Sequence, residues 1–381
     1  MMSLTRTDAK TAKGETRAKW RSLDPVLLLI SLTLSASGIL AVYVAGVDAR
    51  EAYAMNQAFG FAAGLAAAIP LALIDYRLWQ RYLRSIYVLV LLMLLTVLLM
   101  GAAAGGAQRW VDIGPVQVQP SEFAKLGIVI VLAGYFAEKP VGEYPVFLKA
   151  LGILAFPALL VFLQPDLGTA LVFGAIFFAM AYVAGAKLLQ LAGLVFAAAT
   201  AAVLALKLKI LEEYQVARLT SFFSCDEMSD DVCYQVEQSK MAIGSGGLSG
   251  KGLEAQTLAN LGFLPEDHTD FIFSNLAERV GFVGSIVLIV LFFFLIWRIL
   301  HVATISRDRF GVLIAVGVAT IFLFHVFVNV GMTMGIMPVT GIPLPFISYG
   351  RSNLVVSVLS LGLLQSIAIH SKAEVSKHPK V

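Results

Sequence analysis

The sequence predicts an all-α, polytopic membrane protein with ten transmembrane helices. Of its 381 residues, 59% are hydrophobic and 14% are charged, whereas an average soluble domain has about 25% charged residues. Apolar runs long enough to cross a hydrocarbon core of about 30 Å recur along the chain. Because these runs are spread over the whole length, we expect one helical bundle rather than a series of soluble domains.

The chain is expected to have a tail, one transmembrane domain and a second tail. Residues 1–24 are polar and basic, and no small-residue cleavage pattern follows the first apolar run, so we expect this tail to stay attached. The transmembrane domain spans residues 25–370, and residues 371–381 form the second tail. The ten predicted helices are 25–46, 57–74, 85–101, 122–137, 150–164, 168–186, 188–206, 277–297, 310–330 and 353–370.

Lysine and arginine are distributed unevenly over the connecting segments. If the N-terminus lies inside, most of the 28 basic residues fall in the two tails and the short inward connections. This asymmetry orients membrane proteins, and it predicts that both termini lie in the cytoplasm. The net charge of +3 reflects the same asymmetry, so it does not indicate nucleic-acid binding.

One outward segment is much longer than a connection between helices needs to be. Residues 207–276 separate the seventh and eighth predicted helices, whereas most helix connections have roughly 2–8 residues. Its first part, Leu208 to Phe223, has apolar residues at helical spacing with charged residues between them. This pattern favours an amphipathic helix that lies at the membrane interface or packs on the bundle. Long loops of this kind usually carry function.

Two features of this long loop limit its chemistry. Residues 242–252, Ala-Ile-Gly-Ser-Gly-Gly-Leu-Ser-Gly-Lys-Gly, are dense in glycine, so their backbone can approach a ligand closely. They lack the Gly-x-x-x-x-Gly-Lys-Ser/Thr spacing of a P-loop, so we reject nucleotide binding. The chain has two cysteines, Cys225 and Cys233, which would brace the loop if an oxidising compartment closed them into a disulfide.

Polar residues stand at the outward ends of the fourth and sixth predicted helices. Ser121 can cap the fourth helix, and Glu122 and Lys125 lie on one face of its first turn, where they can neutralise each other. A proline ends the fifth helix, and Asp166 stands at the start of the sixth. Asp166 is either a helix cap or a partner of Arg109 or Lys125.

Two further outward segments also carry residues that are unusual for a simple connection between helices. Residues 335–350 contain three prolines, which rule out a regular helix, so this backbone must face protein or a water-filled cavity. Residues 264–273, Leu-Pro-Glu-Asp-His-Thr-Asp-Phe-Ile-Phe, place three carboxylates and a histidine before the eighth helix. Thr269 or Asp270 can cap that helix, and His268 fits a hydrogen-bond anchor.

Six outward motifs, taken in order, resemble the SEDS family of shape, elongation, division and sporulation proteins. The resemblance covers nearly the whole chain. The amino-acid sequence of residues 338–346, together with the short tails, favours the elongation-type members. The chain departs from the family at Arg351, where relatives usually have glycine, and at Arg279, where they usually have glutamate. The motifs are Gly-Ala-Gln-Arg-Trp (106–110), Gln-Pro-Ser-Glu (119–122), Gln-Pro-Asp-Leu-Gly (164–168), Tyr-Gln with Ala-Ile-Gly-Ser-Gly-Gly (234–235 and 242–247), Leu-Pro-Glu with His-Thr-Asp-Phe-Ile-Phe (264–266 and 268–273) and Pro-Val-Thr-Gly-Ile-Pro-Leu-Pro (338–345).

The resemblance implies a peptidoglycan glycosyltransferase of the bacterial cytoplasmic (inner) membrane. Such an enzyme polymerises lipid II into glycan strands on the outer face of the membrane during cell elongation and rod-shape maintenance. The implied partners are lipid II and the nascent strand, a class B penicillin-binding protein that crosslinks the strands, and other membrane proteins of the elongation complex. The family motif places its catalytic aspartate at Asp270.

The chemistry of glycosyl transfer suits this assignment. Inverting transfer from a lipid-pyrophosphate sugar needs a base for the proton of the acceptor 4-hydroxyl, and burial beside Phe271 and Phe273 would raise the pKa of Asp270 toward the working pH. The leaving pyrophosphate needs cations, for which outward-facing residues are candidates. The candidate substrate-binding residues are Arg109, Glu122, Lys125, Asp166, Lys240, Glu266, His268 and Ser348.

The sequence predicts no dedicated metal site. A divalent cation, Mg²⁺ or Mn²⁺, could assist the leaving group if Asp166 and Glu122 held it. Ordinary ion pairs explain these two carboxylates equally well.

Three alternatives stay open at this point. A transporter that flips the lipid-linked precursor fits the many helices and the prolines at membrane depth, although the ionisable residues crowd the outer face instead of forming a path through the midplane. A scaffold that only activates a partner needs no chemistry. Within the family, a division-type glycosyltransferase is the alternative to the elongation type.

Overall fold

Within the residues that the computed structural model describes, nine helices are long and apolar enough to cross a membrane. A tenth apolar helix, α7, has 17 residues. These helices match the ten predicted ones, which confirms the all-α, polytopic fold. The described residues are 22–45, 50–104, 107–114, 116–209, 215–216, 218, 231–255, 257–258 and 266–377.

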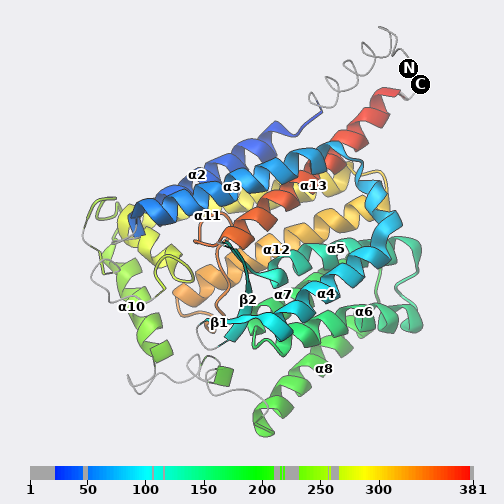
Figure 1. Cartoon of the computed structure of the whole chain (residues 1–381), viewed down its shortest axis with the longest axis horizontal. Helices are drawn as coiled ribbons and strands as arrows, with labels where there is room; N and C mark the ends of the chain where they lie inside the picture. The colour runs from blue at the N-terminus through cyan, green and yellow to red at the C-terminus, as the bar shows by residue number, and fades with distance from the viewer. Residues whose placement is uncertain are drawn as a thin grey trace.

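Successive helices run in opposite directions, so their connections gather at two ends of the bundle (Figure 1). We call the end that holds residues 266–271 the Asp270 end. The helices are α2 (Pro25–Ala45), α3 (Arg50–Leu73), α4 (Leu83–Met100), α5 (Pro120–Glu138), α6 (Tyr144–Phe162), α7 (Leu167–Val183), α8 (Leu188–Lys207), α10 (Asp231–Ser245), α11 (Ile272–Ile305), α12 (Arg309–Thr333) and α13 (Arg351–Lys377), with a 3-10 helix η1 (Tyr76–Tyr82) before α4.

Several helices extend beyond their predicted bounds, and α3 and α11 are the two that bear on the site. α3 begins at Arg50 instead of residue 57, and α11 runs for 34 residues from Ile272 to Ile305. The apolar run marks only the part of a helix that suits lipid, whereas backbone hydrogen bonding continues into polar turns. The additional turns matter because they carry Tyr53 and Asn275, which contact the candidate site.

A small antiparallel sheet lies at the Asp270 end, and the sequence did not predict it. Its strands are β1 (Ala102–Ala104), β2 (Ala107–Ile113) and β3 (Val116–Val118), in the order β1-β2-β3. In the β2–β3 pair, Asp112 lies opposite Gln117, and Gly114 in the connection has a φ of 62°. Strands this short give little periodic signal. The sheet presents Arg109 toward the start of α7.

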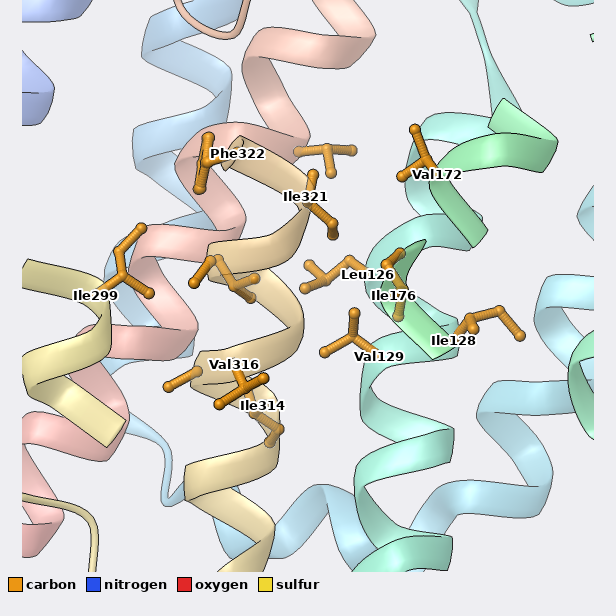
Figure 2. Packing of buried hydrophobic residues seen from close by; sticks show 14 of the residues in the cluster. Leu126, Ile128, Val129, Val172, Ile176, Ile299, Ile314, Val316, Ile321 and Phe322 are labelled. Carbon is orange, nitrogen blue, oxygen red and sulfur yellow. The ribbon is translucent and has the colours of Figure 1, made fainter. Parts of the chain in front are cut away.

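The core of the bundle forms where α12 packs between its neighbours. Figure 2 shows Ile321 of α12 near Leu126 of α5 and Val172 of α7. Gly317 permits this packing, because an added Cβ there would lie 2.6 Å from Val129 Cγ1. Since lipid is as apolar as these side chains, close packing rather than burial from water stabilises the contact.

Small residues also allow α3 and α13 to approach closely. An added Cβ at Gly362 would lie 2.7 Å from the carbonyl oxygen of Ala68, and one at Gly64 would lie 3.1 Å from Val358 Cβ. Small residues at matched positions are the usual means of bringing two membrane helices into backbone contact. The pair forms a continuous interface beside α2 (Figure 1).

At the opposite end of the bundle, Arg298 and Asp24 form a partly buried ion pair. Arg298 Nε donates to Asp24 Oδ2 at 2.7 Å, and the side chain of Asp24 is fully buried. Gln365 brackets the same residue, since its Oε1 accepts from Asp24 N at 2.8 Å and its Nε2 donates to Asp24 O at 2.9 Å. This network joins the start of α2 to α11 and α13.

α11 is broken near the Asp270 end by a glycine-rich insertion, residues 246–252. Gly281 has φ 69° and ψ −169°, a conformation essentially restricted to glycine. The insertion fills the break: Phe282 N donates to Gly247 O at 2.8 Å, and Gly252 N donates to Arg279 O at 3.0 Å. These glycines therefore let the insertion contact the α11 backbone, whereas we had expected close approach to a ligand.

The long segment between α8 and α11 contains a second helix, α10, at the Asp270 end (Figure 1). Cys233 on α10 is disulfide-bonded, while Cys225 lies outside the described residues. The predicted amphipathic helix of residues 208–223 lies largely outside them as well.

Candidate active site

Residues 266–271 form a tight turn directly before α11, which we call the Asp270 turn. Glu266 has a φ of 54°, and its carbonyl oxygen accepts from the backbone N–H groups of Thr269 at 3.2 Å and Phe271 at 3.1 Å. Thr269 Oγ1 also donates to the Glu266 carboxylate at 2.6 Å. The turn is therefore closed by its own hydrogen bonds, and Asp270 does not cap the helix.

The Asp270 turn is also held from outside. Consecutive carbonyl oxygens of a loop need partners when they are buried, and here three in a row have one. The donors come from the proline-rich segment (residues 335–350) and from α12, which lie beside the turn. They are Tyr349 N to His268 O at 2.9 Å, Ser348 Oγ to Thr269 O at 2.7 Å, and Asn329 Nδ2 to Asp270 O at 2.9 Å.

The Asp270 carboxylate faces Arg218 across Gly341. An added Cβ at Gly341, which has a φ of 69°, would lie 3.2 Å from Asp270 Oδ2 and 3.1 Å from Arg218 Nη1. Glycine is therefore required between the two charged groups, both for its backbone conformation and for space.

The environment raises the pKa of Asp270 to about 6. Desolvation by the surrounding protein is the largest cause, although the residue is partly exposed. Arg218 and Arg109 lower this pKa, whereas Glu266 and Asp166 raise it. A carboxylate with a pKa near neutrality is suited to accept a proton in a reaction.

Arg109 and Asp166 lie close enough to influence the pKa of Asp270. Arg109 donates to the carbonyl oxygen of Pro165, which brings β2 to the start of α7. Asp166 caps α7: its carboxylate accepts from Thr169 N at 3.1 Å and from Thr169 Oγ1 at 2.8 Å. Of the two readings of Asp166, the structure supports the helix cap.

Glu122 and Lys125 form a buried ion pair in the first turn of α5. Lys125 Nζ donates to Glu122 Oε1 at 2.7 Å and to His325 Nε2 at 2.9 Å. Because the lysine can only donate, His325 carries its proton on Nδ1 and donates it to Pro343 O at 3.0 Å. Asn353 Nδ2 donates to the other Glu122 oxygen at 2.9 Å. These charges are engaged by protein groups and brace the proline-rich segment.

His268 is anchored by a carboxylate and two aromatic rings. Its Nδ1 lies 3.1 Å from Asp267 Oδ1. Its ring stacks on that of Tyr53, with the ring centroids 5.0 Å apart, and the tilted ring of Tyr349 lies 5.8 Å away. The hydrogen bond with Asp267 raises the pKa of His268, and burial opposes this effect. The geometry matches the hydrogen-bond anchor that we expected for this residue.

Three candidate substrate-binding residues remain, and the structure places each of them differently. Ser348 accepts from Leu344 N at 2.8 Å while it donates to Thr269 O, so it links the proline-rich segment to the Asp270 turn. Glu266 is exposed at the edge of the turn. Lys240 is exposed on α10, and its Cδ would lie 3.4 Å from a Cβ on Gly335. The side chain of Lys240 therefore lies beside the proline-rich segment.

Sequence reasoning did not assign a role in the site to Arg218, Asn329 or Tyr53. Arg218 lies in the segment for which the sequence predicted only an amphipathic helix, and Asn329 lies within the ninth predicted helix. Nothing in the spacing of these residues links them to Asp270, because the contacts join segments far apart in the chain. A buried asparagine in a transmembrane helix was the one available signal.

The fold and the site define a multi-pass membrane protein whose polar groups converge at one end of the bundle around a carboxylate suited to proton transfer. The sequence profile of the family described as "Cell cycle protein", which unites FtsW, RodA and SpoVE, matches residues 23–373. The chain therefore belongs to the SEDS family of membrane proteins.

Individual relatives support this membership. The chain is 37% identical over 355 residues to the peptidoglycan glycosyltransferase MrdB of Escherichia coli (strain K12), covering 92% of this chain and 94% of that protein. Its fold is similar to the Rod shape determining protein RodA of Thermus thermophilus, with a TM-score of 0.70, 29% identity and coverage of 92% and 97%. A chain from a peptidoglycan synthase complex that coordinates polymerization and crosslinking gives a TM-score of 0.78 at 28% identity, with coverage of 92% and 98%.

Proposed function

We propose that this chain polymerises lipid II into glycan strands, as a peptidoglycan glycosyltransferase that acts in cell elongation. The observation that carries the proposal is the Asp270 turn, whose carboxylate has a raised pKa and is surrounded by Arg109 and Arg218. MrdB of Escherichia coli, which is 37% identical to this chain over 355 residues, is a peptidoglycan glycosyltransferase. Together these support an enzyme rather than a scaffold.

Asp270 acts as the general base of the reaction. It takes the proton of the acceptor sugar 4-hydroxyl while that oxygen forms a bond to the anomeric carbon of the donor. The bond between this carbon and the pyrophosphate oxygen breaks on the opposite face, and undecaprenyl pyrophosphate leaves with the electron pair. The anomeric configuration is therefore inverted.

Arg109 and Arg218 stabilise the negative charge that develops on the pyrophosphate. A planar guanidinium can form two parallel hydrogen bonds to phosphate oxygens, and both arginines already act electrostatically on Asp270. Lys240 is exposed on α10 beside Gly335 and adds a positive charge at this end of the bundle. Glu122 and Lys125 contribute through the position of the proline-rich segment rather than by contact with substrate.

The two carboxylates considered for a divalent cation are both hydrogen-bonded to protein groups. Glu122 accepts from Lys125 and Asn353, and Asp166 accepts from Thr169. No group of three or more His, Cys, Asp or Glu residues in the described part of the chain could hold a metal ion. No step of the proposed reaction is assigned to a cation.

The lipid part of the substrate has a matching surface. An open apolar groove is lined by residues of α3, α4, α5 and α13, among them Val90, Phe123 and Ile130. A polyprenyl chain is apolar and would enter such a groove from the membrane. Phe123 lies near the start of α5, so one end of the groove lies toward the Asp270 end.

We place the protein in the bacterial inner membrane with both termini in the cytoplasm and the Asp270 end outside. The excess of lysine and arginine in the segments at the opposite end supports this orientation. The structural similarity to a chain of a synthase complex that coordinates polymerization and crosslinking supports a transpeptidase partner. The partner is then a class B penicillin-binding protein.

One assay tests the function directly. Purified protein, combined with its transpeptidase partner, receives labelled lipid II, and glycan polymer is measured by electrophoresis. We expect polymer from the unmodified chain. Polymer absent from this reaction, together with translocation of lipid II in sealed vesicles, would show a transporter instead.

Replacing Arg218 with glutamine should shift the pH dependence of polymerisation. The base must be deprotonated, so activity falls as the pH drops through the pKa of Asp270, which is about 6. Arg218 lowers this pKa, and its removal should move the acidic limb of the pH profile upward by roughly one pH unit. Initial rates at subsaturating lipid II between pH 5 and 8 would measure the shift.

The matched control is Arg81→Gln, because Arg81 is an exposed arginine of η1 at the opposite end of the bundle. Its pH profile should match that of the unmodified protein. An unchanged midpoint in Arg218→Gln would contradict the electrostatic role of Arg218.

A further inference from the structure

Arg279 is a buried arginine with many neutral partners. It lies in α11 just before the break at Gly281, and it is 2% exposed. Among the described residues, its guanidinium donates to groups at the end of α2, at positions 253, 255 and 257, and on α11 itself. The contacts are Nε to Asn275 Oδ1 at 2.8 Å, Nη1 to Leu253 O at 2.5 Å and Ala255 O at 3.4 Å, and Nη2 to Val44 O at 2.8 Å and Thr257 Oγ1 at 3.2 Å.

The neighbouring carboxylate does not take part in this network. Glu278 is buried, and its oxygens accept from Lys251 Nζ at 2.6 Å and from Leu258 N at 3.1 Å. It holds the glycine-rich insertion and the chain that follows. Arg279 therefore directs its donors away from Glu278, toward Asn275 and the backbone.

Asn275 transmits the position of Arg279 to the Asp270 turn. Its Oδ1 accepts from Arg279, and its Nδ2 donates to Asp267 Oδ2 at 2.9 Å. The orientation of the amide is unambiguous, because an arginine can only donate and a carboxylate can only accept. The other oxygen of Asp267 lies 3.1 Å from His268 Nδ1. The chain of contacts thus ends on two residues of the turn.

We propose that Arg279 and Asn275 are positioning residues for Asp270, which they hold in place through Asp267. The Asp270 turn is fixed on one side by the proline-rich segment and α12, and this relay fixes it on the other. Through Arg279 the position of the turn also depends on Leu253, Thr257 and the end of α2. The inference rests on the proposed function, since it assigns these residues to the geometry of the base.

A positioning role and a simple anchoring role make different demands on Asn275. An anchor needs only that Arg279 stays bonded, whereas a positioning relay needs the amide of Asn275 to accept on one side and donate on the other. Asn275→Asp separates the two cases. It keeps an acceptor for Arg279, with added charge attraction, but it offers no donor to Asp267 and places two carboxylates together.

The test compares Asn275→Asp, Asn275→Ala and Arg279→Lys in the lipid II polymerisation assay. We expect kcat to fall by about 10- to 100-fold in each, because a misplacement near 1 Å can cost that much. KM for lipid II should stay within about twofold, since these residues contact no substrate. Lysine cannot reproduce the fork of five donors at Arg279.

The matched control is Arg298→Lys, the same substitution on the same helix at the opposite end. It disturbs the partly buried pair with Asp24, so its thermal unfolding midpoint should fall, while kcat stays at the unmodified value. Asn275→Asp should show the reverse, with a kcat that falls by much more than any loss of folded protein explains.

The outcomes are distinguishable. If the unmodified chain makes polymer and the Asn275 variants keep its kcat, the positioning role is wrong and the proposed function stands. A fall in kcat only in proportion to the folded fraction would also overturn the inference in favour of anchoring. If the unmodified chain makes no polymer, the proposed function fails, and the positioning role fails with it.

Discussion

Replacing Asp270 with asparagine is expected to reduce glycan polymerisation by about 10²- to 10⁴-fold, the usual contribution of a general base. Asparagine has nearly the same shape, and the backbone carbonyl of this residue would still accept from Asn329 Nδ2. The turn should therefore keep its conformation while the side chain loses the ability to take a proton. The measurement is the initial rate of polymer formation from labelled lipid II by purified protein with its transpeptidase partner.

The control for this substitution is Asp112→Asn. Asp112 is an exposed carboxylate of β2 at the same end of the bundle, and it pairs across the sheet with Gln117. Its replacement should leave the rate within about twofold of the unmodified protein, as surface changes usually do. Polymerisation by Asp270→Asn at the rate of this control would contradict the assignment of the base.

Replacing Gly281 with alanine is expected to destabilise the fold by roughly 3 kcal/mol or more, because two penalties combine. The φ of 69° with ψ of −169° excludes a side chain. An added Cβ would also lie 2.2 Å from the backbone nitrogen of Gly250 and 2.7 Å from Leu248 O. The glycine-rich insertion would have to leave the break in α11, and Phe282 N would lose its partner. Thermal unfolding in detergent would measure the effect.

Gly174→Ala in α7 provides the comparison. An added Cβ there meets no heavy atom within 4 Å, and Gly174 lies inside a regular helix. Alanine should be neutral there or stabilise the helix by roughly 0.5–1 kcal/mol. Equal unfolding midpoints for the two variants would show that the break in α11 does not require glycine.

The break also shows what a sequence pattern can and cannot say. A run of glycines indicates that the backbone must approach something closely, and this expectation is correct for residues 246–252. The object approached is the backbone of α11, and no local feature of the run distinguishes a helix from a ligand. Only the packing of two distant segments decides it.

The same distinction applies to Glu122 and Lys125. Their spacing placed them on one helical face, and the structure confirms a direct ion pair there. Whether the pair also meets substrate depended on its depth and on its other neighbours. His325 and Asn353 come from helices far along the chain, so the sequence could not show that protein groups occupy the remaining hydrogen-bonding positions.

The sequence by itself determined the class of protein and the approximate positions of its apolar helices. These properties follow from local composition, because lipid requires a continuous apolar run wherever a helix crosses it. The tertiary structure alone decided that β2 delivers Arg109, that Arg218 faces Asp270 across Gly341, and that Arg279 reaches the Asp270 turn through Asn275. Each of these is a contact between segments distant in the chain, whose energy depends on packing and hydrogen-bond geometry rather than on local pattern.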